Sequence, residues 1–190
     1  MILSTFPKRP SKHRLWPDFI AEFTFPDEDN PNNDAKRWMI QTNGSSAQKR
    51  GGIGVIITTP NGEILKYGVR LIFPATNNEA EYEGILTGLR LGKALEVKNL
   101  LIQSDSKLMV KQIKGEYEAK EERMQKYLRL TRLLMREFDE VEFVQVPRNQ
   151  NTLANEILKL ALLEEGWLSN NLAMEIQKHP SIKEAPMLTI

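Results

Sequence analysis

Four polar residues in separate parts of the chain are candidates for a shared chemical site. Two are carboxylates, Glu81 and Asp105, and two are amides, Asn43 and Asn155. Asp105 directly follows a short apolar run that predicts a strand, and the carboxyl end of a strand is the usual position for a working residue in an α/β sheet. The chain has no Cys and two His, which excludes thiol nucleophiles, Cys-based zinc sites and a zinc triad of His. Any metal chemistry would therefore use oxygen ligands.

The spacing of apolar residues predicts the elements that hold these four side chains. The expected strands are residues 38–42, 52–59, 63–73, 99–103 and 141–146, and the expected helices are residues 79–96, 107–114, 121–138 and 152–163. The order β-β-β-α-β-α-α-β-α begins with three strands joined by tight turns, which predicts an antiparallel meander. The sequence thus predicts a mixed α/β fold, in which a five-stranded mixed sheet, three antiparallel strands followed by parallel ones, is flanked by helices. This topology would gather the four polar positions.

Proline and composition mark the boundaries of the expected domain. Five of the ten prolines lie within the first 31 residues, so residues 1–36 are expected to be a leader or linker. Residues 37–165 form the expected domain, and the weaker pattern after them makes residues 166–190 an expected tail or linker. No apolar run is long enough for a membrane span or a signal peptide. We therefore expect an intracellular protein, cytoplasmic or nuclear and not secreted, with no membrane partner.

Charge is balanced over the whole chain and concentrated locally. The charged side chains sum to +1, which excludes nucleic-acid binding through bulk positive charge. Between residues 106 and 136, however, nine Lys and Arg accompany four Glu. Basic residues recur there at spacings of three or four, at Arg123, Lys126, Arg129, Arg132 and Arg136. This basic stripe is either an ordinary solvated helix face or a surface for phosphates.

Four short motifs around the candidate site carry a family resemblance. Their sequences are TNGSS at residues 42–46, TNNEAEY at 76–82, SDS at 104–106 and RNQNTLAN at 148–155. With these motifs, residues 38–165 closely resemble the type 1 ribonuclease H domain of gypsy-type LTR retrotransposon polyproteins. The flanking segments 16–24 and 174–182 resemble the linkers that enter this domain and that leave it toward the integrase. The resemblance implies a ribonuclease H-like fold and an origin in such a polyprotein, with a reverse transcriptase or an integrase as partner.

The resemblance also implies catalytic and metal-binding roles for the four positions. Members of the family hold two Mg²⁺ ions with four carboxylates and cleave the RNA strand of an RNA/DNA hybrid. Glu81 and Asp105 match two of these acids, whereas Asn43 and Asn155 stand where the family has its first and last Asp. An amide offers one neutral oxygen in place of two anionic ones, and Mg²⁺ prefers hard anionic oxygens. We therefore expect weak binding of Mg²⁺ or Mn²⁺, and cleavage that is lost or strongly reduced.

Residues near these positions are the expected nucleic-acid contacts. They are Gly44, Ser45, Asn77, Asn78, Lys107, Lys111, Arg123 and Lys126. By resemblance, Asn77 and Asn78 reach the RNA 2′-hydroxyls in the minor groove, although Asn before a helix also serves as a cap. The basic side chains would contact the phosphates of an RNA/DNA hybrid or of another double-stranded nucleic acid.

Three functions remain open on the sequence alone. The first is a hybrid-binding domain of retrotransposon origin whose active site is degenerate. The second is a Mg²⁺-dependent ribonuclease H, a hydrolase and endonuclease, that still cleaves with Glu81, Asp105 and the two amide oxygens. The third is a recruited module that binds a protein partner. Cleavage of a hybrid with Mn²⁺ that disappears in Asp105→Asn would favour the second.

Overall fold

The computed structural model describes residues 37–47, 50–163 and 172–183, so the expected leader at residues 1–36 lies outside the described part. The strands are β1 (Trp38–Ala47), β2 (Arg50–Thr58), β3 (Ile64–Leu71), β4 (Asn99–Ser104), β5 (Glu140–Gln145) and β6 (Leu172–Gln177). The helices are α2 (Asn77–Ala94), α3 (Lys107–Lys114), α4 (Glu122–Met135) and α5 (Thr152–Leu162), with the short 3-10 turns η4 (Arg148–Gln150) and η5 (Ser181–Lys183).

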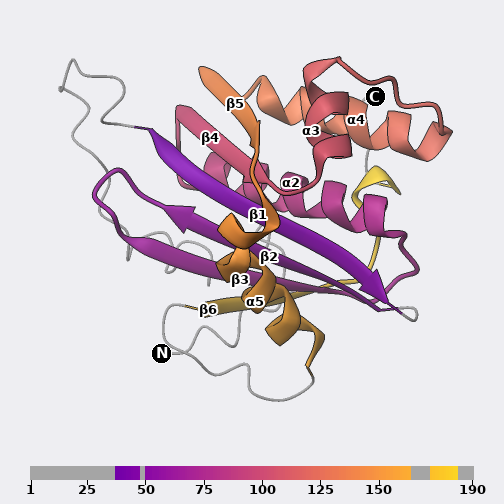
Figure 1. The fold of residues 1–190 in the computed structure, drawn as a ribbon, viewed down its shortest axis with the longest axis horizontal. Helices are drawn as coiled ribbons and strands as arrows, with labels where there is room; N and C mark the ends of the chain where they lie inside the picture. The colour runs from indigo at the N-terminus through magenta and orange to yellow at the C-terminus, as the bar shows by residue number, and fades with distance from the viewer. Residues whose placement is uncertain (1–36, 48–49, 164–171, 184–190) are drawn as a thin grey trace.

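The strands form one mixed sheet in the order β5-β4-β1-β2-β3-β6 (Figure 1). β1, β2 and β3 are antiparallel neighbours. β4 pairs in parallel with β1, and β5 pairs in parallel with β4. The predicted mixed α/β fold, with an antiparallel meander followed by parallel strands, is confirmed. The predicted number of strands is wrong, because the sheet has six strands and not five.

The additional strand, β6, comes from the segment that we expected to be a tail. It pairs in parallel with β3 and forms one edge of the sheet. Ala173 and Met174 are buried, and the buried Glu175 accepts a hydrogen bond from the hydroxyl of Tyr67. In the segment LAMEIQ the polar residues Glu175 and Gln177 are buried like the apolar ones, so its alternation is not that of a strand with one solvated face. Its burial depends on partners from distant parts of the chain, which apolar periodicity does not reveal.

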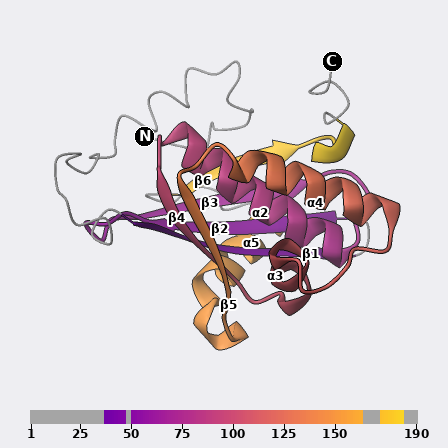
Figure 2. The same ribbon diagram turned by 90° about the horizontal axis from the view of Figure 1, so that it is seen from above.

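Helices cover both faces of the sheet (Figure 2). α2 lies against β1 and β2 with α4 packed against it, and α5 lies on the opposite face, mainly across β2 and β3. α2 begins after Thr76, whose Oγ1 accepts the N–H of Glu79 at 3.1 Å and so satisfies one of the free donors of the first turn. Among the described residues, no helix combines the length and the apolar character that crossing a bilayer requires.

Two glycines determine how closely the helices approach the central strands. A Cβ at Gly54 of β2 would lie 1.9 Å from the carbonyl oxygen of Ala154 in α5. A Cβ at Gly44 of β1 would lie 2.1 Å from the carbonyl oxygen of Ala80 in α2. Only glycine lets each helix backbone lie directly on its strand at these points. In both helices the next residue along the chain is a candidate site residue.

Candidate active site

Sheet register and helix packing bring the candidate side chains together. Thr42 of β1 is the parallel partner of Ser104, the last residue of β4, so Asn43 of β1 lies beside Asp105, which directly follows β4. Asn155 of α5 reaches the same place. Its Oδ1 accepts a hydrogen bond from Nδ2 of Asn43 at 3.2 Å. Three of the four predicted side chains therefore meet beside the middle of the sheet.

Glu81 reaches the site from α2. Its carboxyl group accepts a backbone hydrogen bond from Gly44, the residue after Asn43, and lies close enough to Asp105 for the two acids to repel each other. All four positions predicted from the sequence are thus gathered in one place. Glu156, the neighbour of Asn155, is exposed, as expected for adjacent residues of a helix whose side chains point about 100° apart.

The two acids are half-buried, and their carboxyl groups are incompletely hydrogen-bonded. Oε2 of Glu81 and Oδ2 of Asp105 are buried atoms with no hydrogen-bond partner among the described residues. Burial, and then repulsion from Asp105, raise the pKa of Glu81 to about 8, although the Gly44 hydrogen bond and the charge of Arg148 act in the opposite direction. At neutral pH Glu81 therefore mostly keeps its proton, which lowers the negative charge of the site further.

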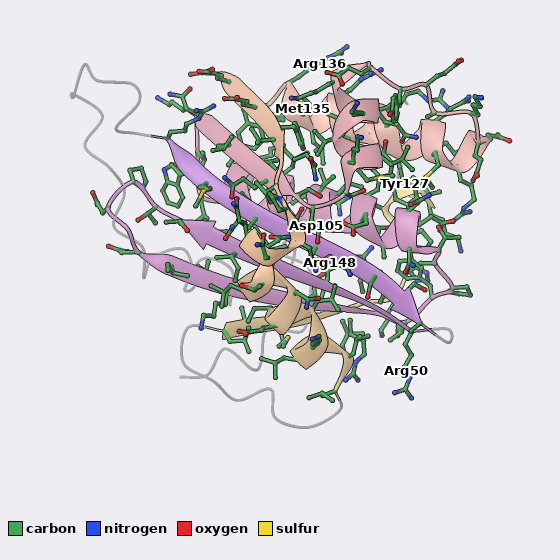
Figure 3. All side chains as sticks on the ribbon, viewed as in Figure 1. Arg50, Asp105, Tyr127, Met135, Arg136 and Arg148 are labelled. Carbon is green, nitrogen blue, oxygen red and sulfur yellow. The ribbon has the colours of Figure 1, made fainter. Side chains whose placement is uncertain are left out.

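A cation stands beside this acid pair. Nε of Arg148 lies 3.7 Å from Oδ2 of Asp105, and the Arg148 side chain is 90% exposed while that of Asp105 is 9% exposed. The two residues are labelled near the middle of Figure 3, in front of the sheet. Our sequence analysis did not single out Arg148. The sequence shows only that a basic residue precedes the last helix. That residue becomes a candidate for the site once the structure places its turn beside the end of β4.

The turn that carries Arg148 is fixed to β1 by two hydrogen bonds. Nδ2 of the buried Asn151 donates to the carbonyl oxygen of Thr42 at 2.9 Å. Nε2 of Gln41 donates to the carbonyl oxygen of Gln150 at 3.1 Å. Both bonds join the η4 turn and the residue after it to β1, at or just before the position of Asn43. Arg148 is therefore presented to the acids by an anchored turn.

The residues present do not fit a pair of metal ions. Among the described residues, no group of three or more acidic or His side chains is placed to hold a metal ion. The amide of Asn43 brings an N–H donor into the cluster, where the resemblance places an anionic oxygen. Arg148 already lies beside Asp105. Of the four side chains in this cluster, Glu81 and Asp105 alone carry carboxyl groups that can supply anionic oxygens.

The predicted nucleic-acid contacts on β1 and α2 lie close to this cluster. Gly44 is buried and Ser45 is half-buried, whereas Asn77 and Asn78 are exposed in the first turn of α2. Oδ1 of Asn77 accepts the N–H of Ser46 at 2.7 Å and so connects β1 to α2. Asn77 thus has a structural role, which leaves Asn78 with the more accessible amide.

The predicted basic contacts lie on α3 and α4, and three of them have partners within the chain. Nη2 of Arg123 lies 3.1 Å from Oε2 of Glu79, and Nζ of Lys126 lies 3.8 Å from Oε1 of Glu122. Nζ of Lys111 lies 3.9 Å from a carboxylate oxygen of Glu116. Lys107 is exposed at the start of α3. Because exposed ion pairs contribute little free energy, Lys111 and Lys126 can exchange their partners for phosphates, whereas Arg123 is held by the buried Glu79.

Comparison with known proteins agrees with this fold. Residues 41–161 match the family described as reverse transcriptase-like. A bifunctional protein of Mycobacterium tuberculosis is 30% identical over 127 residues, which cover 65% of this chain and 35% of the relative. The chain therefore spans about a third of the length of that relative. The ribonuclease HI of Halobacterium salinarum is 27% identical over 110 residues, which cover 58% of this chain and 55% of the relative.

Solved structures extend the similarity to three dimensions. The ribonuclease H1 of Halobacterium salinarum superposes with a TM-score of 0.63 and 26% identity, over 66% of this chain and 97% of that one. The ribonuclease H1 called LC11, solved in complex with an RNA/DNA hybrid, superposes with a TM-score of 0.59 and 29% identity, over 66% of this chain and 96% of that one. The chain belongs to the reverse transcriptase-like family, within the ribonuclease H-like superfamily.

Proposed function

We propose that the chain is a ribonuclease H-like domain that binds RNA/DNA hybrids and has lost most or all cleavage of the RNA strand. The observation that carries this proposal is the composition of the convergent cluster. Two amides that are hydrogen-bonded to each other accompany two carboxyl groups, at positions where the resemblance calls for four acids. The surroundings needed to receive a hybrid are retained, whereas the charge needed for a pair of metal ions is not.

Binding of a hybrid is supported by the similarity to a protein solved with one. The LC11 ribonuclease H1 in complex with an RNA/DNA hybrid shares 29% identity with this chain. Asn78 and Lys107 are exposed at the starts of α2 and α3, beside Glu81 and Asp105 in the sequence. An amide and an ammonium group at these places suit a 2′-hydroxyl and a phosphate, the two groups by which an RNA backbone is recognised.

Reduced cleavage is supported by charge. The proposed metal ligands are Asn43, Glu81, Asp105 and Asn155, and only two of them can be anionic. With the pKa of Glu81 raised to about 8, even one of these two is mostly neutral at pH 7. Mg²⁺ loses its water reluctantly and needs anionic oxygens in return. We therefore propose weak binding of Mg²⁺ or Mn²⁺ and very slow hydrolysis.

The origin belongs to the same proposal. The TNGSS, TNNEAEY, SDS and RNQNTLAN motifs resemble the ribonuclease H domain of gypsy-type retrotransposon polyproteins. In such a polyprotein, a reverse transcriptase or an integrase would be the neighbouring partner. In this proposal, Asp was replaced by Asn at positions 43 and 155, and the domain lost cleavage while it kept its fold.

Reversal of both amides tests this function. A labelled RNA/DNA hybrid is incubated with millimolar Mn²⁺ and the wild-type chain, Asn43→Asp/Asn155→Asp, or Asp105→Asn. We expect the wild-type chain to bind the hybrid saturably, more weakly as salt rises, and to cleave no faster than Asp105→Asn. We expect the double variant to cleave about a hundredfold faster or more, because charge stabilisation by a bound ion contributes several kcal/mol.

Two results would contradict the proposal in different ways. Cleavage by the wild-type chain that disappears in Asp105→Asn would identify an active ribonuclease H. The absence of saturable hybrid binding by the wild-type chain would remove the nucleic-acid function itself and favour the protein-interaction module.

A further inference from the structure

Glu81 and Asp105 create an electrostatic problem for a domain that binds nucleic acid without metal ions. A phosphodiester is anionic, and an ionised carboxylate at the point where it approaches repels it. In the family mechanism, metal ions lie between the acids and the phosphate. The cluster here does not fit a pair of ions, so another cation must serve if the backbone is to pass over Glu81 and Asp105.

Arg148 is the cation that the fold places there. Its Nε lies 3.7 Å from Oδ2 of Asp105, whose side chain is 9% exposed, while the Arg148 side chain itself is 90% exposed. A guanidinium carries five N–H donors, and this contact involves only the Nε side. The terminal nitrogens thus remain available to a ligand in solvent, and a planar guanidinium can bind two phosphate oxygens at once.

The placement of Arg148 does not depend on the ligand. Hydrogen bonds from Asn151 to Thr42 and from Gln41 to Gln150 hold its turn on β1. A side chain on an anchored turn loses less conformational entropy on binding than one on a free loop. The guanidinium is therefore prepared to receive an anion directly above the acid pair.

We propose that Arg148 binds a phosphodiester of the nucleic-acid backbone over the Glu81–Asp105 pair and replaces the metal ions there, so that hybrid binding by this chain does not require a divalent cation. This inference rests on the proposed hybrid-binding function and adds the way in which the phosphate is held. It assigns Arg148 a role in binding and no role in cleavage.

The test measures the affinity of the full chain for a fluorescently labelled RNA/DNA hybrid by anisotropy, in EDTA and in 5 mM Mg²⁺ at constant ionic strength. Arg148→Ala is compared with Lys93→Ala, which also removes one positive charge. Lys93 is exposed near the end of α2, twelve residues after Glu81 and so about 18 Å along the helix. Thermal melts followed by circular dichroism establish that both variants are folded.

We expect the wild-type chain to bind equally well in EDTA and in Mg²⁺, to within about twofold. Arg148→Ala should weaken binding about tenfold, the usual effect of losing a hydrogen bond between charged groups, and should lower the salt dependence by about one phosphate contact. Lys93→Ala should change affinity by less than about twofold. Arg148→Lys, which keeps the charge and loses the bidentate geometry, should lie between Arg148→Ala and the wild type.

A double-mutant cycle with Asp105→Asn tests the shared location. If Arg148 offsets the acid beneath the phosphate, Asp105→Asn should restore several-fold affinity in the Arg148→Ala background, and the two changes should not be additive. Additive effects, equal losses in Arg148→Ala and Lys93→Ala, or wild-type binding that needs Mg²⁺ would each overturn this inference while hybrid binding stands. No saturable binding by the wild-type chain would overturn both the inference and the proposed function.

Discussion

Asn and Asp have nearly the same shape, so the amides at positions 43 and 155 change the charge of the cluster without changing the space around it. The hydrogen bond from Nδ2 of Asn43 to Oδ1 of Asn155 needs a donor that a pair of carboxylates does not have. Two buried acids fewer also means less repulsion between like charges. At the scale of residues, the two amides thus give the cluster one internal hydrogen bond and less repulsion than four carboxylates would have.

The raised pKa of Glu81 predicts a pH dependence of stability. Its pKa is about 8 in the folded chain against an ordinary value of 4.5, so between these pH values the folded state keeps a proton that the unfolded state has released. This contribution to stability is lost as the pH rises through that window, by an amount on the order of a few kcal/mol. Glu81→Gln should abolish this loss of stability, so the variant should become progressively more stable than the wild type as the pH rises. Urea unfolding from pH 4.5 to 8.5 in EDTA measures the free energy of unfolding of both chains.

Glu156→Gln is the matched control for this measurement. It makes the same chemical change at an exposed residue of α5 and should keep the slope of the wild type. Parallel pH profiles of the wild type and Glu81→Gln would show that the carboxyl group of Glu81 titrates in the folded chain as it does in the unfolded one.

At the scale of elements, the cluster depends on how closely α2 and α5 approach the central strands. The site residues Glu81 and Asn155 each follow an alanine whose carbonyl oxygen lies against a glycine of the sheet. A helix displaced outward by one side chain would withdraw its polar residue from the cluster. The glycines of β1 and β2 therefore position the site although they contribute no functional group.

Gly54→Ala should destabilise the chain because the new Cβ would lie 1.9 Å from the carbonyl oxygen of Ala154. Forcing α5 away should cost about 1–3 kcal/mol or more in the free energy of unfolding. The control is Gly84→Ala in α2, where the nearest atom would lie 3.5 Å from the new Cβ, an ordinary contact. There the better helix propensity of Ala should stabilise by up to about 1 kcal/mol. Urea unfolding measures both, and equal effects would refute the packing argument.

At the scale of the whole molecule, a buried carboxylate joins the chain's C-terminal described segment to its core. Glu83 of α2 is fully buried and accepts hydrogen bonds from Tyr127 Oη at 2.9 Å, from Gln177 Nε2 at 3.1 Å and from the Ser181 N–H at 2.8 Å. These partners belong to α4, β6 and η5. Residues 172–183 are thus an integral part of the folded unit and not an appended segment.

Gln177→Ala should therefore destabilise the chain although Gln177 is far from the candidate site in sequence. Removing its amide takes one donor from a buried carboxylate, which should cost about 1–3 kcal/mol. Lys178→Ala changes the next residue, which is exposed, and should alter stability by less than about 0.5 kcal/mol. Differential scanning calorimetry of the two variants checks the prediction, and equal melting temperatures would contradict it.

The local pattern of the sequence was sufficient for most elements. The helix predicted over residues 107–114 coincides with α3, because Ser106 caps its start and Gly115 ends it in a left-handed conformation with φ of 83°. β1 extends beyond its predicted end at Thr42 to Ala47. Its last residues are polar and lack the apolar signal, but they pair with β2 residue by residue.

Residue type and spacing were sufficient to predict the fold class and the convergence of the four polar positions, and the family resemblance implied that two of these positions lack an expected acid. Tertiary structure alone decided the sixth strand, the proton on Glu81 and the place of Arg148. Each of these depends on burial or on contact between residues far apart in the chain. Such contacts set local charge and solvation, and no periodicity along the chain encodes them.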